Sequence, residues 1–204
     1  IIIIRHNSNP NLKASHCGRK QRINREEEFD VDDLKVFIDR ALEQMLRKNT
    51  TRTKFSERYK RIIDSYNAGS MENEDYYDQL VDLVNQLKEE DKRATSEGLN
   101  EAELEMFDLL IAGKSLTKAE EQKVKLSAKN LFNKINKNRE NLLVVDWYKD
   151  EQPRARIKSE IEFSLDQDLP SAYDEVSFND KIDLLMNHFV DMAIQGYGWV
   201  VGAY

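Results

Sequence analysis

The chain has 204 residues, with 38 acidic against 31 basic side chains and a mean hydropathy of −0.72. Glycine (7) and proline (3) are scarce and 34% of the residues are charged, which favours an all-α protein and excludes collagen-like and low-complexity classes. The single cysteine, Cys17, excludes an internal disulfide, and no apolar run approaches the roughly 18 residues of a membrane span, so we expect a cytoplasmic protein without membrane contact.

The sequence is expected to divide into three parts. Residues 1–30 mix Asn, Ser, Pro and basic residues without helical periodicity, so we interpret them as an irregular basic lead-in. Within it, Ile1–Ile4 is compatible with a strand remnant of an upstream domain, and the missing initiator methionine fits a piece of a longer protein. Residues 31–195 carry helical patterning, and 196–204 form a short apolar tail.

Apolar residues in 31–195 recur at spacings of three and four, which predicts amphipathic helices. The expected helices cover roughly 31–46, 52–66, 72–96, 100–113, 117–135, 150–169 and 177–196. About seven helices with short connections favour a single multi-helix bundle, and a subdivision near 97–100 stays open. The apolar run 142–145 fits either a helix end or a short buried segment.

Local signals place several helix ends. Asn100 with Glu103, and Thr117 with Glu120, have the spacing of a capping box, in which the side chain of each residue satisfies a backbone N–H of the other. Pro153 is excluded from a helix interior but tolerated in a first turn, where the backbone N–H has no partner. The sixth helix is therefore expected to begin near 150.

Three motifs invite a catalytic interpretation, and each fails on its context. Gly113–Ser115 has the Gly-Lys-Ser of a phosphate loop, but the second glycine and the preceding strand are missing. Glu121 and Lys123 match a nuclease pair, yet on a helix they point about 200° apart. His188 and Asp191 supply only two metal ligands. We therefore expect no catalytic, cofactor-binding or metal-binding residue.

Charge alternates along the chain. Residues 1–25, 47–61 and 117–139 are basic, whereas 72–97 and 159–195 are acidic. This alternation suits complementary faces that pack within the fold or against other subunits, although solvated helix faces explain it equally well.

Basic residues beside aromatic ones can contact phosphates or partner side chains. The candidate contact residues are Trp147, Tyr148, Arg154, Arg156, Lys158, Lys125 and Lys129. The alternatives are that Trp147 is core with its N–H bonded internally, and that the two arginines pair with Glu160 or Asp150.

Four segments occur in an order typical of one family. They are FSERYKRIIDSYNAG (55–69), EAELEMFDLL (101–110), LTKAEEQKVKLSAKNLF (116–132) and LLVVDW (142–147), the last opening a helical hairpin that continues to 193. Over residues 31–195 the chain resembles the helical C-terminal domain of the R subunit, the motor and endonuclease subunit, of type I restriction enzymes. Pro153 departs from the family pattern.

The resemblance implies that the intact protein cleaves unmodified DNA after translocation that requires ATP and Mg²⁺, in a complex with methyltransferase (modification) and specificity subunits. This chain matches none of the family's motor or nuclease motifs, so no catalytic residue transfers to it. The resemblance implies a domain that docks the subunit onto the methyltransferase core. The alternatives are a DNA-backbone contact module that uses 47–61 and 117–139, and a stand-alone helical interaction scaffold.

Overall fold

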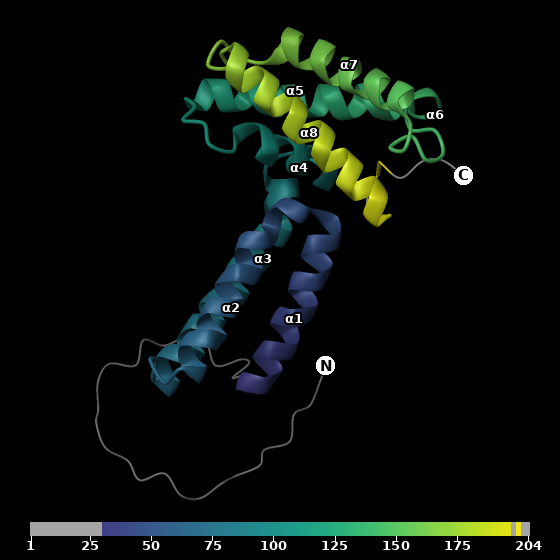
Figure 1. Cartoon of the computed structure of the whole chain (residues 1–204). Helices are drawn as coiled ribbons and strands as arrows, with labels where there is room; N and C mark the ends of the chain where they lie inside the picture. The colour runs from purple at the N-terminus through teal and green to yellow at the C-terminus, as the bar shows by residue number, and fades with distance from the viewer. Residues whose placement is uncertain (1–29, 197–198, 201–204) are drawn as a thin grey trace, which may run out of the picture.

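The computed structural model describes residues 30–196 and 199–200, whose course Figure 1 shows. Our interpretations of residues 1–29, including Ile1–Ile4 and Cys17, lie outside the described residues, as do 197–198 and 201–204 of the tail. The described part contains eight α-helices, one 3₁₀-helix and no strand, which confirms the all-α prediction. The elements are α1 (Val31–Lys48), η1 (Thr50–Arg52), α2 (Thr53–Asn67), α3 (Asn73–Ser96), α4 (Glu101–Ile111), α5 (Lys118–Lys137), α6 (Arg139–Leu142), α7 (Glu151–Asp168) and α8 (Glu175–Gln195).

The helices form two groups, each with its own hydrophobic cluster. Figure 1 shows α1, α2 and α3 standing side by side below, and α4 to α8 layered across their upper end. We call the first group, with η1, the N-terminal unit and the second the C-terminal unit. The two clusters part between Leu87 and Ala94, both of which lie on α3. The domain boundary that we expect near 97–100 stays a prediction.

The core of the N-terminal unit joins one stripe from each of its three helices. Its fully or nearly buried members are Leu34, Ile38, Leu42 and Met45 of α1, Phe55 and Ile62 of α2, and Tyr76, Leu80, Leu83, Val84 and Leu87 of α3. Burial of each large aliphatic side chain stabilises the fold by about 1.5–3 kcal/mol relative to exposure. At the open end of the bundle Tyr66 stacks on Tyr76, with ring centroids 3.9 Å apart.

The core of the C-terminal unit is built from α4, which packs on α5 and α8 and buries Leu104, Met106, Phe107 and Leu110, and from α7, which packs on both α5 and α8. The buried stripes are Val124, Ala128, Leu131 and Ile135 of α5, Ile157, Ile161 and Leu165 of α7, and Ile182, Leu185, Met186 and Phe189 of α8. The tail also contributes, because Val200 is fully buried and Trp199 packs edge-on against Phe132 and Phe189. Composition alone marks this tail as apolar but does not reveal that part of it closes the core.

Both predicted capping boxes are confirmed, at the starts of α4 and α5. Pro153 is the third residue of α7, in the first turn, as expected. The start of α8 is a correction, because α8 begins at Glu175 and not at Ser177. The cap is Asp174, whose side chain accepts a hydrogen bond from the Ser177 N–H at 2.9 Å.

The two short helices, η1 and α6, are absent from the sequence prediction because three or four residues show no periodicity. The apolar run 142–145 turns out to be both a helix end and a buried segment. Leu142 ends α6, Leu143 is fully buried, and Val145 is exposed. None of the helices in the described part is both long enough and apolar enough to cross a membrane.

Candidate functional site

Most of the candidate contact residues gather around the N-terminal half of α7. Two surface grooves of about 570 Å³ each lie along this half-helix, and Ala155 lines both of them. One groove runs between α6 and α7, past Asn141 and Arg156, and the other runs between α7 and α8, past Arg154 and Asp183. We call residues 151–160, which separate the two grooves, the α7 ridge.

Arg154 and Arg156 are exposed on opposite flanks of the α7 ridge. This placement follows from helix geometry, because residues two apart are turned by about 200°. Among the described residues neither arginine has an ion-pair partner, and in particular neither pairs with Asp150 or Glu160. Both guanidinium groups are thus available to a ligand outside the chain.

The other residues of this region are engaged within the chain. Lys158 forms an ion pair with Asp183 of α8, with Nζ 2.7 Å from Oδ1. The half-buried Tyr148 ring packs edge-on against Trp147, at 6.1 Å between centroids. Lys149 lies over the Tyr148 ring, and its hydrogen bond to the exposed Asp146 lowers the pKa of that carboxyl and raises the pKa of the lysine. Of the five candidate contact residues around α7, Arg154 and Arg156 are the two without a side-chain partner among the described residues.

Trp147 belongs to the core, as one of the two alternatives predicted. Only 1% of its surface is exposed, and its Nε1–H donates to the carbonyl oxygen of Val200 at 2.9 Å. The preceding residue, Asp146, has a φ of 58°, which turns the chain sharply ahead of the indole. Trp147 therefore ties the entrance of α7 to the C-terminal tail.

The two candidate lysines of α5 differ from each other. Lys125 forms an ion pair with Glu97 and lies over the Phe107 ring, so its charge is used within the fold. Lys129 is half-buried and has no ion-pair partner among the described residues. The α5 lysines lie on a different helix from the α7 ridge, so the candidates do not form one constellation.

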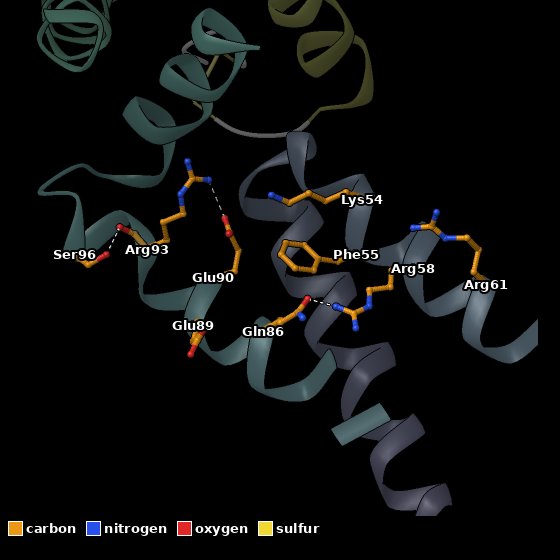
Figure 2. Close-up of a pocket in the computed structure, with 9 residues that line it drawn as sticks. All are labelled: Lys54, Phe55, Arg58, Arg61, Gln86, Glu89, Glu90, Arg93 and Ser96. Carbon is orange, nitrogen blue, oxygen red and sulfur yellow. Dashed lines mark hydrogen bonds and ion pairs between the residues drawn. The ribbon is translucent and has the colours of Figure 1, made fainter. Parts of the chain in front are cut away.

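A third surface feature, between α2 and α3, was not singled out from the sequence beyond the basic stretch 47–61. Figure 2 shows this groove of about 590 Å³, with Lys54, Arg58 and Arg61 on α2 and Arg93 on α3. Arg58 is already paired with Asp82, at 2.7 Å, and hydrogen-bonded to Gln86. The groove is cationic, and two of its four cations, Arg58 and Arg93, are paired with carboxylates of the chain.

The two helical units meet through charged and polar side chains, which we call the polar junction. Its members are Asn49, Thr50, Thr51, Arg52, Glu90, Arg93, Glu101, Glu105 and Asp108. Arg52 is 1% exposed and pairs with Glu90 and Glu101, each at 3.0 Å. Glu105 accepts hydrogen bonds from the backbone N–H and the hydroxyl of Thr50, at 2.8 and 3.1 Å. These long-range pairs fix how α4 sits on the start of α2.

The motifs with a catalytic appearance have structural roles. Gly113 has a φ of 72°, which only glycine adopts readily, and ends α4. Lys181 of α8 donates to the carbonyls of Leu109 and Ala112, at 2.7 and 2.8 Å, and so satisfies the last turn of α4. Burial, together with repulsion from Lys114, lowers the pKa of Lys181.

Neither the metal nor the nuclease interpretation has a basis in the geometry. His188 Nε2 lies 3.1 Å from Glu105 Oε1, at an angle unsuited to a hydrogen bond, and joins α8 to the polar junction. No group of three or more potential metal ligands exists in the part of the chain that the structure describes. Glu121 and Lys123 lie on α5, where helix geometry turns them apart.

The fold and its surfaces define an all-α domain with charged and polar faces. Its particular family follows from comparison with known proteins: the chain belongs to the family described as "Type I restriction enzyme HindI endonuclease subunit-like, C-terminal", which matches residues 17–193. This confirms the resemblance and extends it at the N-terminal side from residue 31 to residue 17. No curated protein and no solved structure matches the chain.

Proposed function

We propose that this domain docks the endonuclease subunit of a type I restriction enzyme onto the methyltransferase core, and that the α7 ridge makes the contact. The family to which the chain belongs supports membership in a multi-subunit complex. On this proposal the ATP- and Mg²⁺-dependent translocation and cleavage of unmodified DNA belong to other domains of the intact protein, and this domain contributes attachment.

The observation that carries the proposal is the pair of unpaired arginines on the ridge. Arg154 and Arg156 are exposed, whereas Lys158 next to them is neutralised by Asp183. Arginine is enriched among the residues that dominate protein–protein affinity, because its planar group can bind a carboxylate at two points and stack on an aromatic ring. A ridge with a groove on each side also offers shape complementarity to a cleft in a partner.

The composition of the two grooves favours a protein over DNA as the occupant. Acidic side chains stand among the basic ones, with Glu160 in the α6–α7 groove and Glu151 and Asp183 in the α7–α8 groove. Phosphates packed along a duplex would be repelled by these carboxylates. A protein face with both signs of charge can match them.

The test is a titration of this domain against the methyltransferase–specificity complex of the same system, followed by isothermal calorimetry. Reversal of both charges, Arg154→Glu with Arg156→Glu, is expected to weaken binding by at least about tenfold, since each tenfold step corresponds to about 1.4 kcal/mol. The matched control is Arg40→Glu with Lys60→Glu, two exposed and unpaired cations of the N-terminal unit. The control is expected to bind like the wild type.

Two results would contradict the proposal. One is an absence of binding by the wild-type domain, which removes the docking function. The other is equal binding by the wild type and the ridge variant, which removes the α7 ridge as the contact surface.

A further inference from the structure

One face of α5 carries lysine and amide side chains without an acidic one. The outer face of α5 consists of Gln122, Lys123, Leu126, Lys129, Asn133, Asn136 and Lys137. At 100° per residue these side chains fall within an arc of about 140°. The two acidic residues of the helix, Glu120 and Glu121, lie in its first turn and outside this arc. The α5 outer face therefore contains lysine and amide side chains, the exposed Leu126 and no carboxylate.

The polar side chains of this face make no hydrogen bond or ion pair with another described side chain, although the pKa of Glu120 is lowered by its hydrogen bonds with Thr117 and, to a smaller extent, by the charge of Lys123. Lys123 and Lys137 are exposed and Lys129 is half-exposed, and none of the three lies within ion-pairing distance of an acidic group. The amides of Asn133 and Asn136 make no hydrogen bond to another described side chain. By contrast Lys125 and Lys134, on the flanks of the helix, are engaged with Glu97 and with Gln167 and Phe163.

In the other basic stretch, 47–61, four of the seven cations are engaged within the fold, and Lys54, Lys60 and Arg61 are exposed without an ion-pair partner among the described residues. Among its cations Arg47 pairs with Glu43, Lys48 with Asp91, and Arg58 with Asp82, while Arg52 is buried in the polar junction. The structure therefore separates two stretches that look alike in sequence. Residues 47–61 use four of their seven cations within the fold, whereas Lys123, Lys129 and Lys137 of 117–139 lie together on one helix face without a carboxylate.

We propose that the α5 outer face binds the phosphate backbone of duplex DNA, independently of base sequence. Lysine ammonium groups and side-chain amides are donors to phosphate oxygens, and such contacts position a protein on a duplex without reading its bases. The face runs from residue 122 to 137, about 22 Å at 1.5 Å per residue, which is long enough to meet several phosphates of one strand.

The absence of other groups from this face excludes the competing occupants. No aromatic side chain lies on the α5 outer face, so there is no platform on which unpaired bases would stack, and a single strand is a poorer ligand than a duplex. Protein interfaces are depleted in lysine and enriched in aromatic residues and arginine, the reverse of what this face offers. The inference is independent of the docking role of the α7 ridge.

The experiment measures binding of a labelled 20-base-pair DNA duplex of arbitrary sequence by fluorescence anisotropy, over a salt series from 50 to 200 mM. The test variant is Lys123→Gln with Lys129→Gln and Lys137→Gln, which removes charge while keeping helix propensity. The wild type is expected to bind with an affinity that falls steeply as salt rises. The variant is expected to bind at least tenfold more weakly at 50 mM, with a salt slope smaller by about one for each lysine removed.

The matched control is Lys54→Gln with Lys60→Gln and Arg61→Gln, which removes three charges from the stretch 47–61, and it is expected to bind like the wild type. Circular dichroism checks that both variants keep the helical content of the wild type. Equal losses of duplex affinity in the two triple variants would mean that binding depends only on the net charge of the chain, and this result would overturn the proposal. No measurable duplex binding at 50 mM, or tighter binding of a single strand or of an RNA duplex of the same sequence, would overturn it as well.

Discussion

Arg93 of α3 holds Asp108 of α4 at two points, with Nη1 3.0 Å from Oδ2 and Nη2 2.5 Å from Oδ1. Burial by itself lowers the pKa of Arg93, but the hydrogen bond and the charge of Asp108 outweigh it, so the pKa is raised. The two residues lie on either side of the turn that leads from α3 into α4. A planar two-point contact resists rotation better than a single bond, so this pair fixes the angle between the two helical units.

The neighbouring Arg52 provides the sharpest test of the polar junction. Arg52→Ala leaves Glu90 buried without its cation, which is expected to lower the free energy of unfolding by about 3–5 kcal/mol. Urea unfolding followed by circular dichroism measures the loss. Arg47→Ala is the control, because its exposed pair with Glu43 is worth no more than about 1 kcal/mol. Similar losses in both variants would show that the junction contributes no more than a surface pair.

A second prediction compares the two tryptophans. Trp147 donates its N–H to Val200, whereas the Nε1 of Trp199 is buried with no partner among the described residues. Trp147→Phe and Trp199→Phe lose the same ring volume, but only the first also leaves a carbonyl without its donor. We expect Trp147→Phe to be more destabilising by about 1–3 kcal/mol in urea unfolding. Equal losses would argue that the tail carbonyl finds another donor.

The third prediction concerns alkaline pH. Tyr173 donates its hydroxyl hydrogen to the Leu110 carbonyl at 2.9 Å, and burial raises the pKa of Tyr173 to about 12. The unfolded state releases this proton at lower pH, so the stability from Tyr173 is complete below about pH 10 and is lost as the pH rises to about 12. Over this window the wild type should lose on the order of 2 kcal/mol more than Tyr173→Phe.

Urea unfolding at a series of pH values measures both curves, and tyrosinate absorbance reports the titration directly. Subtraction of the Tyr173→Phe curve removes the contribution of lysines and other tyrosines that titrate in the same range. Parallel curves for the two proteins between pH 10 and pH 12 would contradict the prediction.

The fourth prediction concerns the capping boxes. In the first box the backbone N–H of Glu103 donates to the side-chain oxygen of Asn100. In the second box the backbone N–H of Glu120 donates to the side-chain oxygen of Thr117. Asn100→Ala and Thr117→Ala are each expected to cost about 1 kcal/mol in thermal or urea unfolding. The control is Ser115→Ala in the exposed loop before α5, which is expected to change stability by less than about 0.5 kcal/mol. If Asn100→Ala left the stability unchanged, water would satisfy the first backbone N–H groups of α4 as well as Asn100 does.

The sequence predicts well whatever depends on neighbours three or four residues apart. The amphipathic helices, both capping boxes and the place of Pro153 follow from local rules, and the structure confirms them, although Phe37, which has the spacing of the α1 stripe, is exposed. The start of α8 is wrong by two residues because Asp174 and Ser177 are both competent caps, and the carboxylate is the one used. Local rules do not tell which of two nearby residues, each able to cap a helix, is the one that does so.

Contacts between distant residues are beyond those rules. The pairs Arg52–Glu90 and Thr50–Glu105 join positions 38 and 55 apart, and nothing local selects these two acids from the 38 in the chain. For the same reason the sequence left open whether Arg154 and Arg156 pair internally. It also showed 47–61 and 117–139 as equivalent basic stretches, and only the fold reveals that Arg47, Lys48, Arg52 and Arg58 of the first are paired within the chain.

α3 is shared by the two halves of the molecule, since Leu80 and Leu87 lie in one core and Ala94 in the other. Its 24 residues form a rod of about 36 Å at 1.5 Å per residue. Unfolding of either unit alone would have to break α3 or expose the apolar side chains at one of its ends. We therefore expect the two units to unfold together. A calorimetric scan should therefore show a single endotherm. A rotation imposed on one helical unit would also be transmitted to the other unit, because the continuous helix α3 belongs to both cores.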